Sequence, residues 1–302
     1  MGTEIVSPRY AGIDAWDPAE ILEALIEGQL AAVAAVRAAR RAIEQAALAT
    51  EARMRDGGRL VYAGAGTSGR LAAQDGAELS PTFSWPKERV LFLLAGGESA
   101  LIKAIEGAED KPEQGCALVR ENRVGPEDVL IAVAASGTTP FTLACLREAK
   151  ARGALTIGIA NNQNTPLLTE ADHGIWLDTG AESIAGSTRL KAGTAQKATL
   201  NLLSSLVMIR LGHVYGGLMV DVQASNKKLV RRSENMLMHL TDRSREDVRE
   251  ALARADGSVK LAALLLQGCT PAEAEVALEQ ADGQLREALR SVREPSGAKT
   301  SA

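Results

Sequence analysis

Residues 60–71 read LVYAGAGTSGRL, an apolar run that ends in three closely spaced glycines, Gly64, Gly66 and Gly69. Continuous apolar runs of this length are typical of strands buried on both faces of a parallel sheet. Glycines directly after such a strand permit a tight turn into a helix. The stretch therefore predicts a strand that passes through a glycine turn into a helix.

Similar apolar runs follow along the chain, at residues 90–95, 129–134, 155–160 and 174–177. Segments of helix length lie between them, among them 99–108 and 139–151. This alternation predicts an α/β fold, a doubly wound, mostly parallel five-stranded sheet flanked by helices. In such sheets ligands bind beyond the carboxyl ends of the strands, so the loops after the strands are the candidate sites.

Helical patterns flank the predicted sheet on both sides. Asp17 and Pro18 are typical of a helix start, and the pattern continues to residue 54 as one long helix or two shorter ones. A long helix is predicted at 187–211, and short helices follow at 244–253, 258–266 and 271–279. We expect an α/β domain over residues 1–232 and a small helical domain over 233–302, with a disordered tail from residue 294.

Composition limits the classes of partner. The 34 basic and 38 acidic residues leave a net charge of −4, which provides no electrostatic footprint for nucleic acid. An anionic ligand must therefore be bound by a local site.

No apolar run is long enough to span a bilayer, and the first residues lack a signal-peptide pattern, so we expect a cytoplasmic protein without a membrane partner. Cys116, Cys145 and Cys269 and the three histidines are too scattered to predict a disulfide or a metal site.

The first loop, Gly66-Thr67-Ser68-Gly69, fits a phosphate better than a dinucleotide. It matches GxGxxG, but no acidic residue closes the second strand in the register that a ribose requires. Two hydroxyls beside backbone N–H groups at a helix start suit a single phosphate. A plain strand-to-helix turn remains the alternative.

A second loop of the same kind follows the third predicted strand, with Ser136, Gly137, Thr138 and Thr139 before a proline. Two such loops at the carboxyl ends of parallel strands can surround one phosphate on several sides. The chain lacks the GxxxxGK[ST] motif, which argues against nucleoside triphosphate hydrolysis. Ser187 and Lys191 open the long helix and are further candidates for an anion contact; a capped helix start with exposed basic residues is equally open there.

These loops resemble those of the sugar isomerase (SIS) domain, and within it the chain resembles the N-acetylmuramic acid 6-phosphate etherases. The resemblance covers most of the chain, in the expected order. It is carried by GAGTSGRL (64–71), ELSPTF (78–83), AGGE (95–98), EGAED (106–110), GSTRLKAGTAQK (186–197) and GLMVDVQASNKKL (217–229).

The resemblance implies a lyase that cleaves the D-lactyl ether of N-acetylmuramic acid 6-phosphate, without a metal or organic cofactor, as a homodimer. It implies Glu78 and Glu109 as the two catalytic carboxylates. Taken by itself, Glu109 reads as a solvated helix acid like Glu106. Glu78 lies near the end of a helical stretch that Pro81 cannot allow to continue far, and the negative end of the helix dipole there favours an acid/base role.

The sequence departs from the etherase pattern at two places. Thr138 stands where these enzymes usually have arginine, and Leu79-Ser80 replaces Cys-Pro after Glu78. The first difference removes a possible anion contact, and neither difference touches the two carboxylates. Two other functions stay open: a sugar-phosphate sensor like the glucokinase regulatory protein, and a sugar-phosphate isomerase on the same fold.

Overall fold

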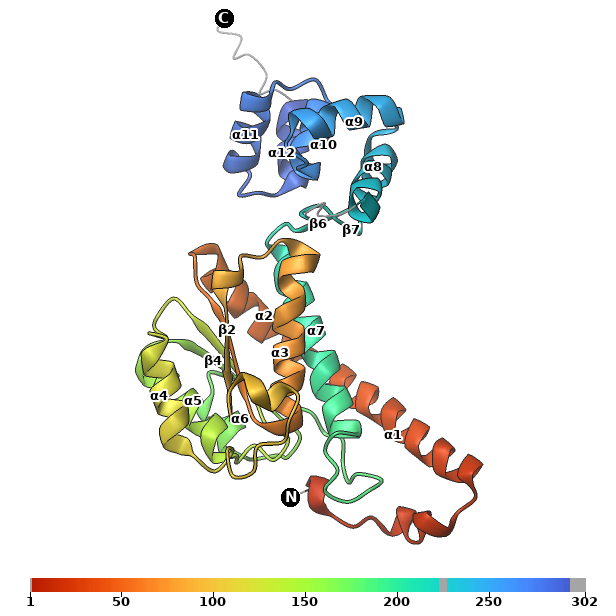
Figure 1. Ribbon diagram of the computed structural model, residues 1–302, viewed down its shortest axis with the longest axis vertical. Coiled ribbons are helices and arrows are strands. Elements are labelled where there is room, and N and C mark those ends of the chain that lie inside the picture. The colour runs from red at the N-terminus through yellow and green to blue at the C-terminus, as the bar shows by residue number, and fades with distance from the viewer. Residues whose placement is uncertain (1, 223–226, 294–302) are drawn as a thin grey trace, which may run out of the picture. The chain divides into compact units, whose positions relative to one another are not determined.

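A five-stranded parallel sheet forms the centre of the α/β part of the chain (Figure 1). The computed structural model describes residues 2–222 and 227–293. The strand order is β2-β1-β3-β4-β5. The strands are β1 (Leu60–Gly64), β2 (Val90–Leu94), β3 (Val129–Val133), β4 (Leu155–Ala160) and β5 (His173–Trp176). The five predicted strands and the doubly wound class are confirmed.

Helices flank the sheet because they form the crossovers that connect successive parallel strands. α3 (Gly66–Phe83) follows β1, α4 (Pro112–Glu121) lies between β2 and β3, α5 (Pro140–Ala151) follows β3, and α6 (Pro166–Glu170) follows β4. β1 and β3 are buried along their whole length, which explains their unbroken apolar sequence. Gly115 lets α4 pack closely on α5, since a Cβ atom there would lie 2.6 Å from the carbonyl oxygen of Phe141.

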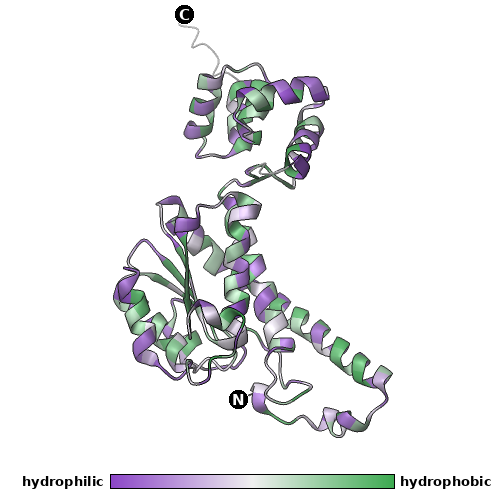
Figure 2. Ribbon diagram, viewed as in Figure 1, coloured by the Kyte–Doolittle hydropathy of each residue, from purple (hydrophilic) through white to green (hydrophobic). Residues whose placement is uncertain are grey.

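The N-terminal helical region is two helices, α1 (Pro18–Ala38) and α2 (Arg40–Arg55), after the short 3-10 turns η1 (Gly2–Glu4), η2 (Pro8–Tyr10) and η3 (Ile13–Ala15). Asp17 occupies the N-cap position of α1, but its side chain makes no capping hydrogen bond. α1 buries small residues, including Ala24, Gly28 and Ala32, and leaves larger apolar side chains exposed. Figure 2 shows these apolar turns along α1.

Two predicted helices differ from the structure. The expected helix at 99–108 is wrong: only the 3-10 turn η5 (Glu98–Leu101) forms, and the chain then turns through Gly107 at φ +67°. The regular helix, α4, begins later, with Pro112 in its first turn. The second long helix, α7 (Lys191–Arg210), begins four residues later than predicted.

The chain divides into two compact units. The first contains residues 1–77 and 87–207, and the second contains 78–86 and 208–302. The expected boundary after residue 232 therefore falls inside α8 (Lys227–Thr241), a helix of the second unit. The predicted tail from residue 294 lies outside the described residues.

The second unit is mainly helical, as the sequence predicted for its C-terminal part. It contains the hairpin β6 (Val214–Tyr215) and β7 (Leu218–Met219), then α8, α9 (Arg245–Arg254), α10 (Val259–Leu265), α11 (Pro271–Gln280) and α12 (Leu285–Arg293). Its core is formed by apolar side chains that include Leu237, Val248 and Leu264. Among the described residues, no helix combines the length and apolarity needed to cross a membrane.

Candidate functional site

The loops after β1, β2 and β3 leave the same edge of the sheet. β1 pairs with β2 on one side and with β3 on the other, with Gly64 opposite Leu94 and Val133. The chain thus reverses its direction of winding at β1. In open α/β sheets this switch point, at the carboxyl ends of the strands, is where ligands bind.

The first loop depends on glycine at two contacts. A Cβ atom on Gly64 would lie 2.9 Å from the Cα of Gly69, and one on Gly69 would lie 2.8 Å from the carbonyl oxygen of Gly64. Strand and helix can approach this closely only without side chains. Gly66, with φ +54°, then begins α3. Thr67 and Ser68 therefore stand in the first turn of α3, where backbone N–H groups lack partners within the helix.

The second loop is held in one conformation by its own hydroxyls. Ser136 Oγ lies 3.2 Å from Thr139 Oγ1 and accepts a hydrogen bond of 3.2 Å from the backbone N–H of Thr138. Gly137 has φ +70°, and its carbonyl oxygen accepts the N–H of Leu167 in α6. The loop therefore leads into α5 in a fixed geometry.

Glu109 lies beside this second loop. Its carbonyl oxygen accepts a 3.0 Å hydrogen bond from the N–H of Phe141, in the first turn of α5. Its side chain is exposed, and the residue sits in a turn and not in the expected helix. The structure therefore joins the backbone of Glu109 to the first turn of α5, directly after the second loop, a contact that the sequence alone did not predict.

Arg70 was not among the predicted site residues, although it organises this edge. Its Nε donates to the carbonyl oxygen of Ala100 at 2.9 Å, and its Nη2 donates to that of Lys103 at 3.2 Å. α3 thereby holds the loop that follows β2. Its position as the last residue of the GAGTSGR motif could have identified Arg70 from the sequence.

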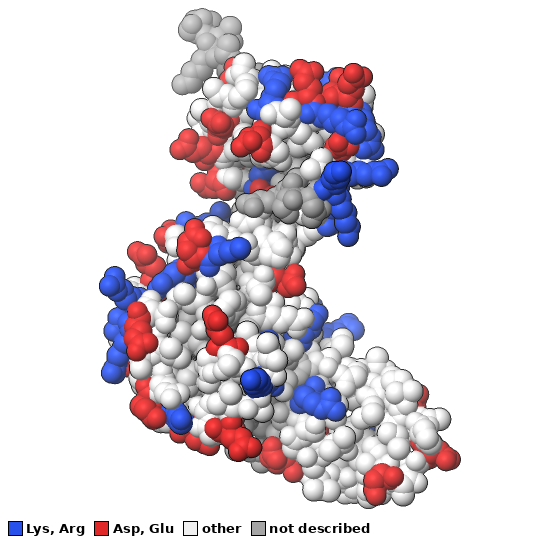
Figure 3. Space-filling view, in the orientation of Figure 1, with Lys and Arg blue, Asp and Glu red and all other residues white. Residues whose placement is uncertain are grey.

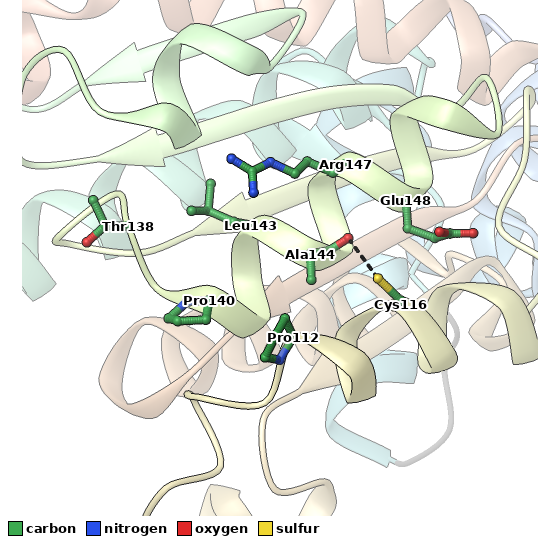
Figure 4. Close-up of a pocket in the computed structure, with 8 residues that line it drawn as sticks. All are labelled: Pro112, Cys116, Thr138, Pro140, Leu143, Ala144, Arg147 and Glu148. Atoms are coloured by element: carbon green, nitrogen blue, oxygen red, sulfur yellow. Dashed lines mark hydrogen bonds between the residues drawn. The ribbon is translucent and has the colours of Figure 1, made fainter.

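A groove of about 570 Å³ lies next to the second loop (Figure 4). Thr138 lies at one end, and the walls from α4 and α5 are mainly apolar. The two charged lining residues are paired, Arg147 with Glu170 at 2.6 Å and Glu148 with Arg120 at 2.8 Å. The lining residues are Pro112, Cys116, Thr138, Pro140, Leu143, Ala144, Arg147 and Glu148.

The start of α7 adjoins the first loop, but its backbone N–H groups already donate to the side chain of Glu182. A Cβ atom on Gly193 would lie 3.6 Å from Thr67 Cγ2. Glu182 accepts hydrogen bonds from the N–H groups of Lys191 at 3.0 Å and Ala192 at 2.9 Å. The Lys191 ammonium is engaged as well, since it donates to the carbonyl oxygen of Ala181. Ser187 is half-buried in the turn before the helix.

Glu78 is exposed on α3, which continues through Pro81 and ends at Phe83. By its contacts it belongs to the second compact unit, whereas the two hydroxyl loops and Glu109 belong to the first. The structure brings Glu109 to the second loop. The role of Glu78 rests on its motif.

The second unit has a groove of its own, of about 840 Å³, with basic side chains gathered over α8 (Figure 3). Lys227, Lys228, Arg231 and Arg232 line it, and each is exposed. Within residues 2–222 and 227–293, no three His, Cys, Asp or Glu side chains are arranged to hold a metal ion.

Comparison with known proteins agrees with this geometry. Residues 41–150 match the model of the glucokinase regulatory protein N-terminal SIS domain, and residues 113–206 match the SIS domain. A phosphoheptose isomerase from Francisella tularensis has the same fold, with a TM-score of 0.50 and 19% identity over 64% of this chain and all of that one. The fold is that of a SIS domain, and both hydroxyl loops lie within the matched residues.

Relatives across nearly the whole chain define the family more narrowly. An N-acetylmuramic acid 6-phosphate etherase from Deinococcus radiodurans is 51% identical over 95% of this chain and 94% of that protein. Another from Clostridium acetobutylicum is 39% identical over 96% of both. The chain belongs to the N-acetylmuramic acid 6-phosphate etherase family.

Proposed function

We propose that this protein is a carbon–oxygen lyase that cleaves the D-lactyl ether of N-acetylmuramic acid 6-phosphate, giving N-acetylglucosamine 6-phosphate and D-lactate. The observation that carries the proposal is the 51% identity to an etherase over nearly the full length of both proteins. Both motif carboxylates, Glu78 and Glu109, are retained. The proposal includes amino-sugar recycling in the cytoplasm and needs no cofactor.

The first and second loops are the proposed phosphate site. The N–H groups at the start of α3, with Thr67 and Ser68, supply donors on one side. The hydroxyls of Ser136, Thr138 and Thr139 supply donors on the other. Because β1 and β3 are neighbours, both sets of donors lie at one edge of the sheet. Ser187 completes the proposed set.

The proposed reaction is an elimination followed by hydration. In the ring-opened sugar a base removes the proton on C2, next to the C1 aldehyde, and the electron pair forms a C2–C3 double bond as the C3–O bond breaks. An acid protonates the departing lactate oxygen. Water then adds to C3, and C2 regains a proton. We assign proton transfer at C2 to Glu78, and lactate departure or water addition to Glu109.

The decisive experiment is incubation of the purified protein with N-acetylmuramic acid 6-phosphate and measurement of D-lactate. We expect D-lactate and N-acetylglucosamine 6-phosphate in equal amounts. Ketose formation without lactate would instead support an isomerase. Binding of the phosphosugar without turnover would support a sensor.

The Glu78→Gln variant tests the assignment of the base. We expect loss of lactate release and of exchange of the C2 proton with solvent deuterium, because glutamine cannot accept that proton. Glu106→Gln, at an exposed acid in the same motif region as Glu109, is the matched control and should retain both. Exchange at the wild-type rate in Glu78→Gln would show that another group removes the proton.

We also propose a homodimer formed through α1. Leu22, Ile26, Leu30 and Val33 recur at helical spacing and are 43–66% exposed. The surface over α1 is largely free of charge (Figure 3). An apolar stripe of this kind marks an interaction surface, and a two-fold axis would pair it with its own copy.

Light scattering after size exclusion tests the dimer. The double variant Ile26→Glu/Leu30→Glu should elute with the mass of one chain, because the charges would have to be buried in the interface. Glu44→Gln, at an exposed polar position on α2, should elute like the wild type. A wild-type mass of one chain would contradict the dimer.

A further inference from the structure

A single carboxylate, Asp221, connects separate segments of the second unit. Its Oδ2 lies 2.6 Å from the Lys260 Nζ in α10. The same oxygen lies 2.8 Å from Nδ1 of His213, a close contact without the alignment of a hydrogen bond. The side chains are largely buried, with 10% of Lys260, 17% of His213 and 21% of Asp221 exposed. Asp221 therefore ties the hairpin region to the helical core.

Asp221 and His213 also contact the C-terminal end of α3 and the residues directly after it. Ser84 Oγ donates a hydrogen bond to the carbonyl oxygen of Asp221. The rings of Phe83 and Trp85 lie beside the His213 imidazole, with centroids 6.2 and 5.8 Å away. Trp85 is buried. Phe83, the last residue of α3, and the two residues after it thus contact Asp221 and His213.

This end of α3 carries Glu78. The N–H of Ser84 donates to the carbonyl oxygen of Ser80 at 3.0 Å, and that of Trp85 donates to Leu79 at 3.4 Å, so residues 79–85 form one continuous hydrogen-bonded turn. Leu79, the neighbour of Glu78, is 2% exposed. Movement of residues 83–85 would therefore be transmitted through the last turn of the helix to Glu78.

Stability alone does not explain a buried charge cluster of this kind. Replacing a buried ion pair with well-packed apolar side chains is often neutral or stabilising. A charged, directional contact instead fixes the position of the side chains that make it and of the residues packed against them. Catalytic groups are sensitive to position, since a displacement of about 1 Å can cost about 100-fold in rate.

We propose that Asp221, together with Lys260 and His213, positions Glu78 for proton transfer at the sugar. This inference rests on the proposed function of Glu78. It makes the helical unit part of the catalytic apparatus: the unit sets the orientation of the base through Ser84 and the rings beside it. Asp221 is a positioning residue, because it acts through residues 83–85.

The Asp221→Asn variant removes the charge and keeps the shape. We expect kcat for D-lactate release to fall about 10- to 100-fold, with KM for N-acetylmuramic acid 6-phosphate within about twofold, because the phosphate loops are untouched. Exchange of the C2 proton should fall in parallel. A wild-type kcat in Asp221→Asn, with Glu78→Gln inactive, would overturn the inference.

Glu234→Gln is the matched control in the same unit. Glu234 is a buried carboxylate shared by two cations, Arg245 at 2.5 Å and Arg249 at 2.7 Å, which lie on α9. We expect a lowered unfolding midpoint and an unchanged kcat. Equal losses of kcat in both variants would show that Asp221 only stabilises the unit.

Hydrogen–deuterium exchange provides a readout that does not require activity. In Asp221→Asn, amides of residues 78–86 should exchange faster than in the wild type, whereas in Glu234→Gln they should not. Unchanged exchange in Asp221→Asn overturns the inference, whatever the enzyme does. Absence of lactate from the wild type, with faster exchange in Asp221→Asn, would overturn the proposed function and leave the mechanical link intact.

Discussion

At the scale of single residues, the loops of the candidate site depend on glycines at positions where a side chain would overlap with neighbouring atoms. Gly64 and Gly69 bring β1 and α3 together, and Gly137 sits against Thr165, where a Cβ atom would lie 2.1 Å from Thr165 Oγ1. The backbone of Gly137 is also left-handed, at φ +70°. Both constraints act on the loop that presents Ser136 and Thr138.

The Gly137→Ala variant should lose about 3 kcal/mol or more of unfolding free energy, because it combines a left-handed backbone with overlap in a packed region. Gly57→Ala is the control. Gly57 has φ +91° and open space around its Cβ position, so it should lose only about 1 to 2 kcal/mol. Denaturant titration measures both, and equal losses would mean that the contact with Thr165 is relieved by movement.

At the scale of elements, the start of α7 is decided by one carboxylate. Glu182 is 1% exposed and accepts the N–H groups of Lys191 and Ala192. Nearby negative charge stabilises the N-terminus of a helix. Its contacts explain why α7 begins at Lys191, whereas the sequence pattern predicted a start at Ser187.

The Glu182→Ala variant should lower the unfolding free energy by about 1 to 3 kcal/mol, because buried N–H groups lose their acceptor. Asp178→Ala removes an exposed carboxylate four residues earlier and should change it by less than about 0.5 kcal/mol. Thermal unfolding followed by circular dichroism compares the two. An unchanged midpoint in Glu182→Ala would mean that water or another side chain takes over the cap.

At the scale of the whole molecule, buried carboxylates make stability depend on pH. Burial by itself would raise the pKa of Asp128, but the hydrogen bonds from Arg59 and Gly125 and the Arg59 charge outweigh it and lower that pKa. Arg59 binds both oxygens of Asp128, at 2.9 and 2.8 Å. Because the folded pKa lies below the unfolded value of about 3.9, this stabilisation is present above about pH 4 and is lost as pH falls through the folded pKa.

Asp128→Asn should therefore lower stability at neutral pH and flatten its decrease below about pH 4. Denaturant titrations of both proteins at a series of pH values measure the difference, which should shrink as the wild-type carboxylate is protonated. Asp75 has the opposite effect on the pH dependence of stability. Burial raises its pKa, so its protonation favours the folded state. A difference that stays constant with pH would show that Asp128 does not titrate with folding.

The sequence by itself determined the sheet and the chemistry of its loops. β1 and β3, which are buried along their whole length, were predicted from unbroken apolar runs, and the other three strands from apolar runs between segments of helix length. The glycine turn after β1 was visible because strand and helix cannot meet there with side chains. The prediction from local patterns was wrong at residues 99–108. The segment has the length of a helix, but it forms a loop whose carbonyl oxygens accept hydrogen bonds from Arg70, a residue of α3. Local patterns also set the domain boundary too late, at residue 232.

Only the tertiary structure decided which distant residues meet. It joined Glu109 to the start of α5, and Ser84, next to the end of α3, to Asp221, 137 residues further along the chain. Such contacts have no local signature, because a hydrogen bond between segments far apart in the chain imposes no spacing on either one. Strand and turn patterns are physical constraints on neighbours in sequence, whereas the environments of Glu78 and Glu109 depend on neighbours in space.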